Sequence, residues 1–219
     1  AVVDTPAGVF WMSGSGFFTY DGSSVREIQC DVHDKVFSDL NPAQISKCWA
    51  VANGPNGEVW FYYPSANSTE IDRYVVFDYK EGHWSMRALA RTAGIDRGVF
   101  KTPVWGDPDG SIYNHEVGFN YDGGEVYAES GPFKIGAGEN LAVVTSLIPD
   151  ELNLGDVTTT FKTRLYPTST ETSDGPYTLT QPTSVRLQGR QVRMKVTGNT
   201  PSAWRVGRFR FEAKPGGKR

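Results

Sequence analysis

Hydrophobic and polar residues alternate in short runs along most of the chain, and Gly, Asn, Asp and Pro separate these runs. Alternation with a period of two is typical of half-buried β-strands. Only residues 34–50 suggest a helix, because Asn41 is a favoured capping residue and Pro42 a favoured first residue of a helix. The pattern therefore predicts an all-β fold with one short helical segment.

The predicted strands fall into groups separated by short turns. Residues 8–32 hold three strands, residues 47–90 hold four, and residues 98–131 hold a third group. Groups that recur every ~40–50 residues are typical of β-propeller blades, and roughly 4–8 blades close a propeller. We therefore expect residues 1–133 to form propeller-like blades that are incomplete in this chain, with the missing blades upstream in a longer chain or in a partner chain.

The second group shows the expected geometry of one blade. In residues 58–63, alternation places Trp60 and Tyr62 on one face of a strand and Phe61 and Tyr63 on the other. The polar segment 64–71 is expected to be an exposed loop and a candidate contact with another subunit, with three residues as the main candidates: Asn67, Ser68 and Glu70.

Residues 134–219 have longer strands with clean alternation, which predicts an antiparallel sheet that belongs to a sandwich. Residues 185–196 place apolar side chains on one face, and Gly189 permits a bulge or turn between two strands. The alternating positions Arg186, Arg193 and Lys195 are then expected to face outward. We expect a domain boundary between residues 133 and 134.

Charge is distributed unevenly along the chain. Residues 1–149 contain 10 basic and 19 acidic side chains, whereas residues 150–219 contain 12 basic and 6 acidic ones. A basic sheet can contact a partner subunit or nucleic acid, and we favour the partner subunit. The predicted interaction residues in this part are Arg186, Arg190, Arg193, Lys195, Arg205, Arg208 and Arg210.

Tryptophan recurs about once per strand group. The predicted role is packing between blades, and the alternative is an exposed platform for sugars. The residues expected in the core are Trp11, Trp49, Trp60, Trp84 and Trp105.

No residue pattern predicts catalysis, a metal, a cofactor or a small-molecule substrate. Asp31, His33 and Asp34 fit a polar strand end better than a metal site. Residues 106–110 read as a turn rather than a calcium loop, since the carboxylates stop after Asp109. The sequence lacks a serine-nucleophile motif, and nothing pairs its carboxylates for glycoside hydrolysis.

Two cysteines, Cys30 and Cys48, are predicted to be buried free thiols in a reducing compartment, because a chain of this size needs no disulfide. A disulfide between them is the alternative. No apolar run is long enough to span a membrane, and the first residues show no signal peptide.

Several segments resemble the propeller-type tail hub, nozzle or DNA-stabilisation proteins of tailed bacteriophages. The resemblance lies in Trp60 to Ser65, in the segment from Asp72 to Val76 and in Trp84, and it extends to residues 89–100, 112–119, 129–139 and 189–219.

The resemblance implies a virion structural protein rather than an enzyme. Copies would form a ring in the tail, contact neighbouring tail proteins and packaged DNA, and help to form or close the conduit for DNA ejection. Assembly would take place in the host cytoplasm. Two alternatives remain at this point: a propeller that binds or hydrolyses carbohydrate, and a nucleic-acid-binding sheet at residues 150–219.

Overall fold

A computed structural model describes residues 1–119, 125–136, 140–199 and 201–217. These residues form antiparallel sheets and two short helices, so the predicted all-β fold is confirmed. The chain divides into two compact units, Ala1–Gly118 and Phe119–Arg219. Residues 127–129 and Phe133, which the sequence assigned to the blades, pair with a strand of the second unit.

The first sheet is a four-stranded meander in which each strand pairs with the next along the chain. The prediction of three strands missed the first, which is short and begins at Val2. The strands are β1 (Val2–Thr5), β2 (Gly8–Met12), β3 (Phe17–Tyr20) and β4 (Val25–Ile28).

Two helical segments follow, α1 (His33–Asp39) and the 3₁₀ helix η1 (Pro42–Lys47). The Asn41 side chain accepts a hydrogen bond from the Ala43 amide at 3.0 Å, and Pro42 is the first residue of η1. The predicted helix start is therefore correct. The helix is not continuous, because Leu40 has extended backbone angles and forms a β-bridge with Ser65.

The second sheet is the predicted four-stranded meander. Phe61 and Tyr63 belong to one buried cluster and Tyr62 to another, with Trp60 packed beside Tyr62, so the strand has the predicted two faces. Trp84 lies near the start of the last strand, as predicted. The strands are β5 (Trp49–Asn53), β6 (Glu58–Tyr63), β7 (Arg73–Asp78) and β8 (His83–Ala88).

The third sheet has three short strands, β9 (Ala93–Ile95), β10 (Val104–Gly106) and β11 (Ile112–Asn114). The prediction placed its first strand at residues 98–106, whereas residues 98–103 are not a strand and the sheet begins at Ala93. The sequence also pairs residues 119–124 with 125–131 as a hairpin, and residues 127–129 of this segment pair with β18 (Gln191–Gly198) in the second unit. Its residues 120–124 lie outside the described part.

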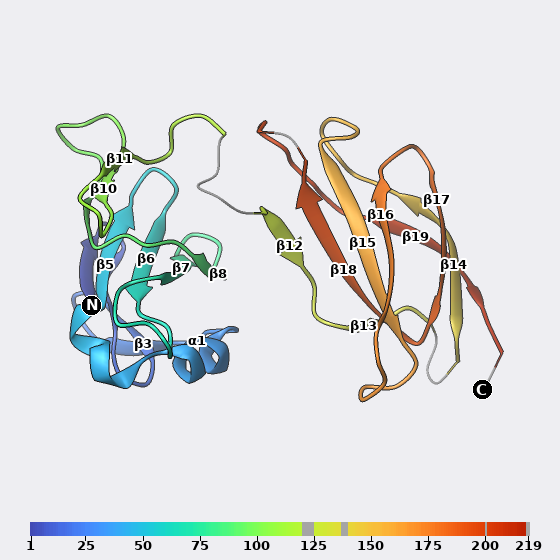
Figure 1. Ribbon diagram of the computed structural model, residues 1–219, viewed down its shortest axis with the longest axis horizontal. Coiled ribbons are helices and arrows are strands. Elements are labelled where there is room, and N and C mark those ends of the chain that lie inside the picture. The colour runs from blue at the N-terminus through green and yellow to red at the C-terminus, as the bar shows by residue number, and fades with distance from the viewer. Residues whose placement is uncertain (120–124, 137–139, 200, 218–219) are drawn as a thin grey trace. The chain divides into compact units, whose positions relative to one another are not determined.

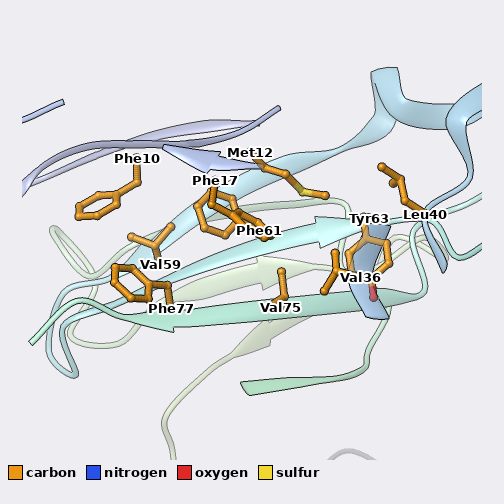
Figure 2. Close-up of a cluster of buried hydrophobic side chains, with 10 residues drawn as sticks. All are labelled: Phe10, Met12, Phe17, Val36, Leu40, Val59, Phe61, Tyr63, Val75 and Phe77. Atoms are coloured by element: carbon orange, nitrogen blue, oxygen red, sulfur yellow. The ribbon is translucent and has the colours of Figure 1, made fainter. Parts of the chain in front are cut away.

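The three sheets pack as a row in which the first strands are neighbours: β1 lies beside β5, and β5 beside β9. Figure 2 shows Phe10 and Phe17 of the first sheet facing Val59 and Phe61 of the second. On the opposite face of the second sheet, Tyr62 packs with Trp105 of β10. This arrangement resembles consecutive propeller blades, but the described sheets form no closed ring.

Tryptophan packing differs from the prediction at one position. Trp105 is fully buried, and Trp49, Trp60 and Trp84 pack partly buried against the clusters. Trp11 is not part of the core: it stacks on Phe18, with ring centroids 5.7 Å apart, on the face of β2 opposite Phe10. The error arises because Phe10 and Met12 already occupy the inward positions of that strand.

The second unit is a sandwich of two antiparallel sheets (Figure 1). A hydrophobic cluster lies between the sheets. At Gly189 the chain leaves one sheet and enters the other, so the predicted bulge or turn is a change of sheet. One sheet contains β12 (Tyr127–Glu129), β13 (Phe133–Lys134), β15 (Val157–Arg164), β16 (Thr172–Thr178) and β18 (Gln191–Gly198). The other contains β14 (Ala142–Ile148), β17 (Thr183–Gly189) and β19 (Arg210–Pro215).

Candidate interaction surface

The predicted basic residues of the sandwich do not form one patch. Arg193 and Lys195 lie on β18, whereas Arg186 and Arg210 lie on β17 and β19 of the opposite sheet. Period-two alternation and the pairing registers turn all four side chains away from the sandwich core. Two separate outer faces therefore carry the charge.

The face of β12, β15, β16 and β18 is internally compensated, and we call it the paired face. Lys195 Nζ lies 2.5 Å from Glu125 Oε2. Arg193 contacts two carboxylates, with its guanidinium nitrogens 3.6 Å from Glu129 Oε1 and 3.2 Å from Glu171 Oε1. Glutamates thus neutralise the two strand residues that looked most available for a partner.

Glu129 lies at the centre of this ion-pair network. Burial by itself would raise the pKa of its carboxyl group, but the hydrogen bond from Lys162 and the charges of Lys162, Arg193 and Lys195 outweigh burial and lower the pKa. The carboxylate is therefore held ionised by its neighbours, as expected for a structural ion pair.

Arg190 is also engaged within the unit. Its guanidinium lies over the ring of Tyr166, 4.7 Å from the centroid, and its backbone amide donates to the Arg164 carbonyl. Arg190 lies where the chain passes from one sheet to the other, so these contacts stabilise that connection. Its charge is therefore engaged within the unit.

The face of β14, β17 and β19 has the opposite character, and we call it the cationic face. Three basic side chains point outward from it: Arg186, Arg210 and Lys214. Glu212 is the acidic residue among them, and the described residues show no ion pair for any of the three cations. Lys214 was missed by the sequence prediction, although its spacing of four from Arg210 on one strand would have revealed it.

Arg205 and Arg208 lie in the segment that leads into β19. Both are exposed, and their backbone is fixed: the Arg205 carbonyl accepts from the Leu152 amide, and the Arg208 amide donates to Asp150 Oδ2 at 3.1 Å. The anchoring holds two further cations on a defined backbone next to the cationic face.

The loop at residues 64–71 is partly ordered by the 3₁₀ helix. Asn41 Nδ2 donates to the Ser68 carbonyl at 2.9 Å, and Lys47 pairs with Glu70. The Asn67 side chain is exposed. Ser68 and Glu70 are therefore engaged inside the chain, whereas Asn67 is exposed and hydrogen-bonds to no other residue in the described part of the chain.

Two of the candidate metal residues, His33 and Asp34, contact each other at the start of α1. His33 Nδ1 lies 3.0 Å from Asp34 Oδ1, and its Nε2 lies 3.0 Å from the Ser15 carbonyl. These two hydrogen bonds raise the pKa of the imidazole. Within the described residues, no group of three or more His, Cys, Asp or Glu side chains has the arrangement of a metal site.

The acidic segment at 106–110 is a turn, as predicted. Asp107 Oδ1 accepts hydrogen bonds from the amides of Asp109 and Ser111, and Gly110 has φ of +91°. The carboxylate oxygens are thus occupied by the turn's own backbone.

Glu58 is a half-buried acid at the start of β6. Burial raises the pKa of its carboxyl group, while Trp60 and Asn53 each donate a 2.9 Å hydrogen bond to Oε2. Both partners lie within five residues of Glu58, so the two hydrogen bonds hold the carboxylate within the β5–β6 hairpin.

Cys30 and Cys48 are free, as predicted, and are partly buried. Burial raises the pKa of the Cys30 thiol to about 11 and also raises that of Cys48. Burial is the largest influence on both thiols and makes them less acidic than reactive cysteines.

No helix in the described part of the chain is long and apolar enough to cross a membrane. No protein-family model matches the chain. A search of curated proteins likewise finds no match.

Proposed function

We propose that this chain is a virion structural protein: a hub or nozzle subunit of a phage tail that assembles by protein–protein contacts and helps to form or close the genome conduit. The observation that carries the proposal is the row of sheets with neighbouring first strands, which is the blade arrangement that the phage-like segments imply. The proposal includes no catalytic step and no cofactor.

The cationic face is the surface that would contact a neighbouring protein. It carries Arg186, Arg210 and Lys214 against Glu212, whereas the paired face has its own counter-charges. Residues 1–149 carry an excess of acidic side chains, so another copy or a neighbouring tail protein of similar charge would be complementary. Packaged DNA is the second candidate partner of this face.

The first test asks whether the chain is a component of virus particles. Peptide mass spectrometry of purified particles from the source of this sequence should detect the chain in stoichiometric amounts, and antibody-gold labelling in negative-stain images should place it on the tail. Absence of the chain from purified particles would contradict the proposal.

The second test examines the cationic face. The variant R186E/R210E should weaken association with the acidic tail partner by tenfold or more, measured by sedimentation velocity or light scattering, because like charges then oppose each other. The variant K35E makes the same kind of charge change on exposed helix α1 and should have little effect. Unchanged assembly together with loss of a steeply salt-dependent DNA affinity would instead favour the nucleic-acid function.

A further inference from the structure

The first sheet has an apolar face that no described element covers. Cross-strand pairing places Trp11 beside Val2 and Phe18, and Val9 beside Tyr20. None of these side chains belongs to a buried cluster of the described residues. The apolar members of this first open face are Val2, Val9, Trp11, Phe18, Tyr20 and Val25.

Exposure on this face is high for an antiparallel sheet, whose solvent side is normally polar. Val2 is 65 % exposed, Val25 is 61 % exposed and Tyr20 is 40 % exposed. Two acidic residues, Asp4 and Glu27, share the face by their register with Val9 and Phe18.

The third sheet exposes a second apolar face at the other end of the row. Trp105 points toward the second sheet, so its strand neighbours Val104 and Gly106 point away from it. Their cross-strand partners include Ile95, which is 53 % exposed, and Ile112, which is 76 % exposed. Two exposed cations, Arg97 and Lys101, lie in the loop after β9.

The middle sheet shows what occupies such faces in this protein. One face of β5–β8 packs against β1–β4 and the other packs against β10 (Figure 2 shows the first contact). A blade-like sheet with neighbours on both sides is therefore covered on both faces by other sheets. The open faces occur at the two ends of the row, where the described chain supplies no further sheet.

We propose that the open face of β1–β4 in one copy packs against the open face of β9–β11 in a second copy, so that the row of sheets continues from chain to chain. Aromatic side chains of the first face would meet aliphatic side chains of the second, and Asp4 and Glu27 would approach Arg97 and Lys101. The contact is head to tail, and such contacts build rings or open filaments. This inference rests on the part of the proposed function in which copies of the chain associate.

The size of the contact predicts its strength. The smaller face limits the contact: its three strands, about 4.8 Å apart and each with three residues at about 3.4 Å, give a flat area of roughly 150 Å². Stable interfaces bury about 800 Å² per partner, so this contact by itself should be weak. Association is therefore expected at high micromolar concentration.

The test measures the mass of the whole 219-residue chain by light scattering and sedimentation velocity from about 1 to several hundred micromolar, the range in which weak interfaces populate. The native chain should associate, and W11E and I112E should each weaken association at least tenfold. V25E changes a more exposed position of the first open face. It should also weaken association at least tenfold, without disturbing the fold. L154E changes an exposed leucine of the sandwich and should associate like the native chain.

Mixing W11E with I112E gives the most specific result. Each variant keeps one intact face, so the mixture should form a dimer that cannot grow further. A native chain that remains monomeric throughout would overturn the proposal. Association of I112E at the level of the native chain would also overturn the proposal, because the first open faces of two copies would then pair with each other.

The two hypotheses can fail separately. Loss of association in R186E/R210E, with native-like association in W11E and I112E, would contradict the sheet-to-sheet contact and leave the proposed function intact. Association that depends on both open faces, in a chain absent from virus particles, would contradict the proposed function and leave the contact intact.

Discussion

Lys162 of β15 donates a 3.0 Å hydrogen bond to Glu129 of β12 across the intervening strand β18. The bond shows that cations on this face of the sandwich are matched by carboxylates from strands distant in sequence. On the opposite face, the described residues show no such ion pairs for Arg186, Arg210 and Lys214. The excess positive charge of the C-terminal residues is therefore concentrated on the cationic face.

Removal of the central carboxylate should make the sandwich less stable at neutral pH. The lowered pKa of Glu129 means that its contribution is present above the ordinary value of 4.5 and is lost as pH falls through the depressed value in the folded state. We expect E129Q to lower the free energy of unfolding at pH 7 by up to about 1 kcal/mol, since the network is partly exposed.

The measurement is urea unfolding of native chain and E129Q by far-UV circular dichroism, at pH values from 7 down to 3. The difference in unfolding free energy between the native chain and E129Q should become smaller below pH 4.5. E212Q is the matched control, because no ion pair is found for Glu212 within the described residues. A difference that is independent of pH would contradict the assigned role.

Gly94 provides space for Trp105 in the third sheet. A Cβ at residue 94 would lie 2.3 Å from Cδ1 of the fully buried indole. We expect G94A to destabilise the first unit by about 1–3 kcal/mol through overpacking. Tryptophan fluorescence during urea unfolding reports mainly on this unit, which contains five of the six tryptophans.

G98A is the control for this change, because no atom lies within 4 Å of a Cβ added there. It should leave the unfolding midpoint nearly unchanged. Equal midpoints for the two variants would show that the indole can move aside at little cost.

Phe17 and Phe18 are adjacent on β3 but lie on opposite faces. Phe17 is fully buried, with ring centroids 5.2 Å from Phe61 and 4.6 Å from Trp84, whereas Phe18 stacks on Trp11 outside the core. F17A should cost about 3–5 kcal/mol of stability and F18A much less. Urea unfolding at low protein concentration measures both, and similar losses would contradict the assignment of faces.

Cys30 should react slowly with alkylating reagents in the folded chain. At pH 8, a pKa of about 11 rather than 9.0 reduces the thiolate fraction by about 100-fold. Mass spectrometry of the Cys30 peptide after timed iodoacetamide treatment should show this difference between folded and denatured protein. The difference in alkylation rate between folded and denatured protein should become smaller above pH 10. Equal rates at pH 8 would contradict a buried thiol.

Local sequence was sufficient for much of the first unit. The run from Glu58 to Tyr63 revealed both faces of its strand, and Asn41 with Pro42 revealed the start of the 3₁₀ helix. Turn residues such as Gly110 marked the hairpins, because these signals act over a few residues. The short strands β1 and β9 carry too few residues for alternation to be read.

The candidate surface depended on contacts between distant segments. Arg193 and Arg186 have the same outward alternation in the sequence. Glu129 and Glu171 neutralise Arg193, whereas the residues that the structure describes provide no ion pair for Arg186. The difference follows from the change of sheet at Gly189, which places the two arginines on opposite sides of the sandwich. Strand alternation fixes the direction of a side chain relative to its own sheet only.

The sequence by itself determined an all-β chain, a meander of blade-like sheets, a charged C-terminal sandwich and the inward or outward direction of most strand residues, since these depend on periodicity and turn chemistry. Tertiary structure decided which strands share a sheet, which charges meet, and which apolar faces are left open. Trp11 and Trp105 look alike in the sequence, but one lies on an open face and the other is buried. That distinction depends on what packs against each sheet, and residues far apart in the chain determine it.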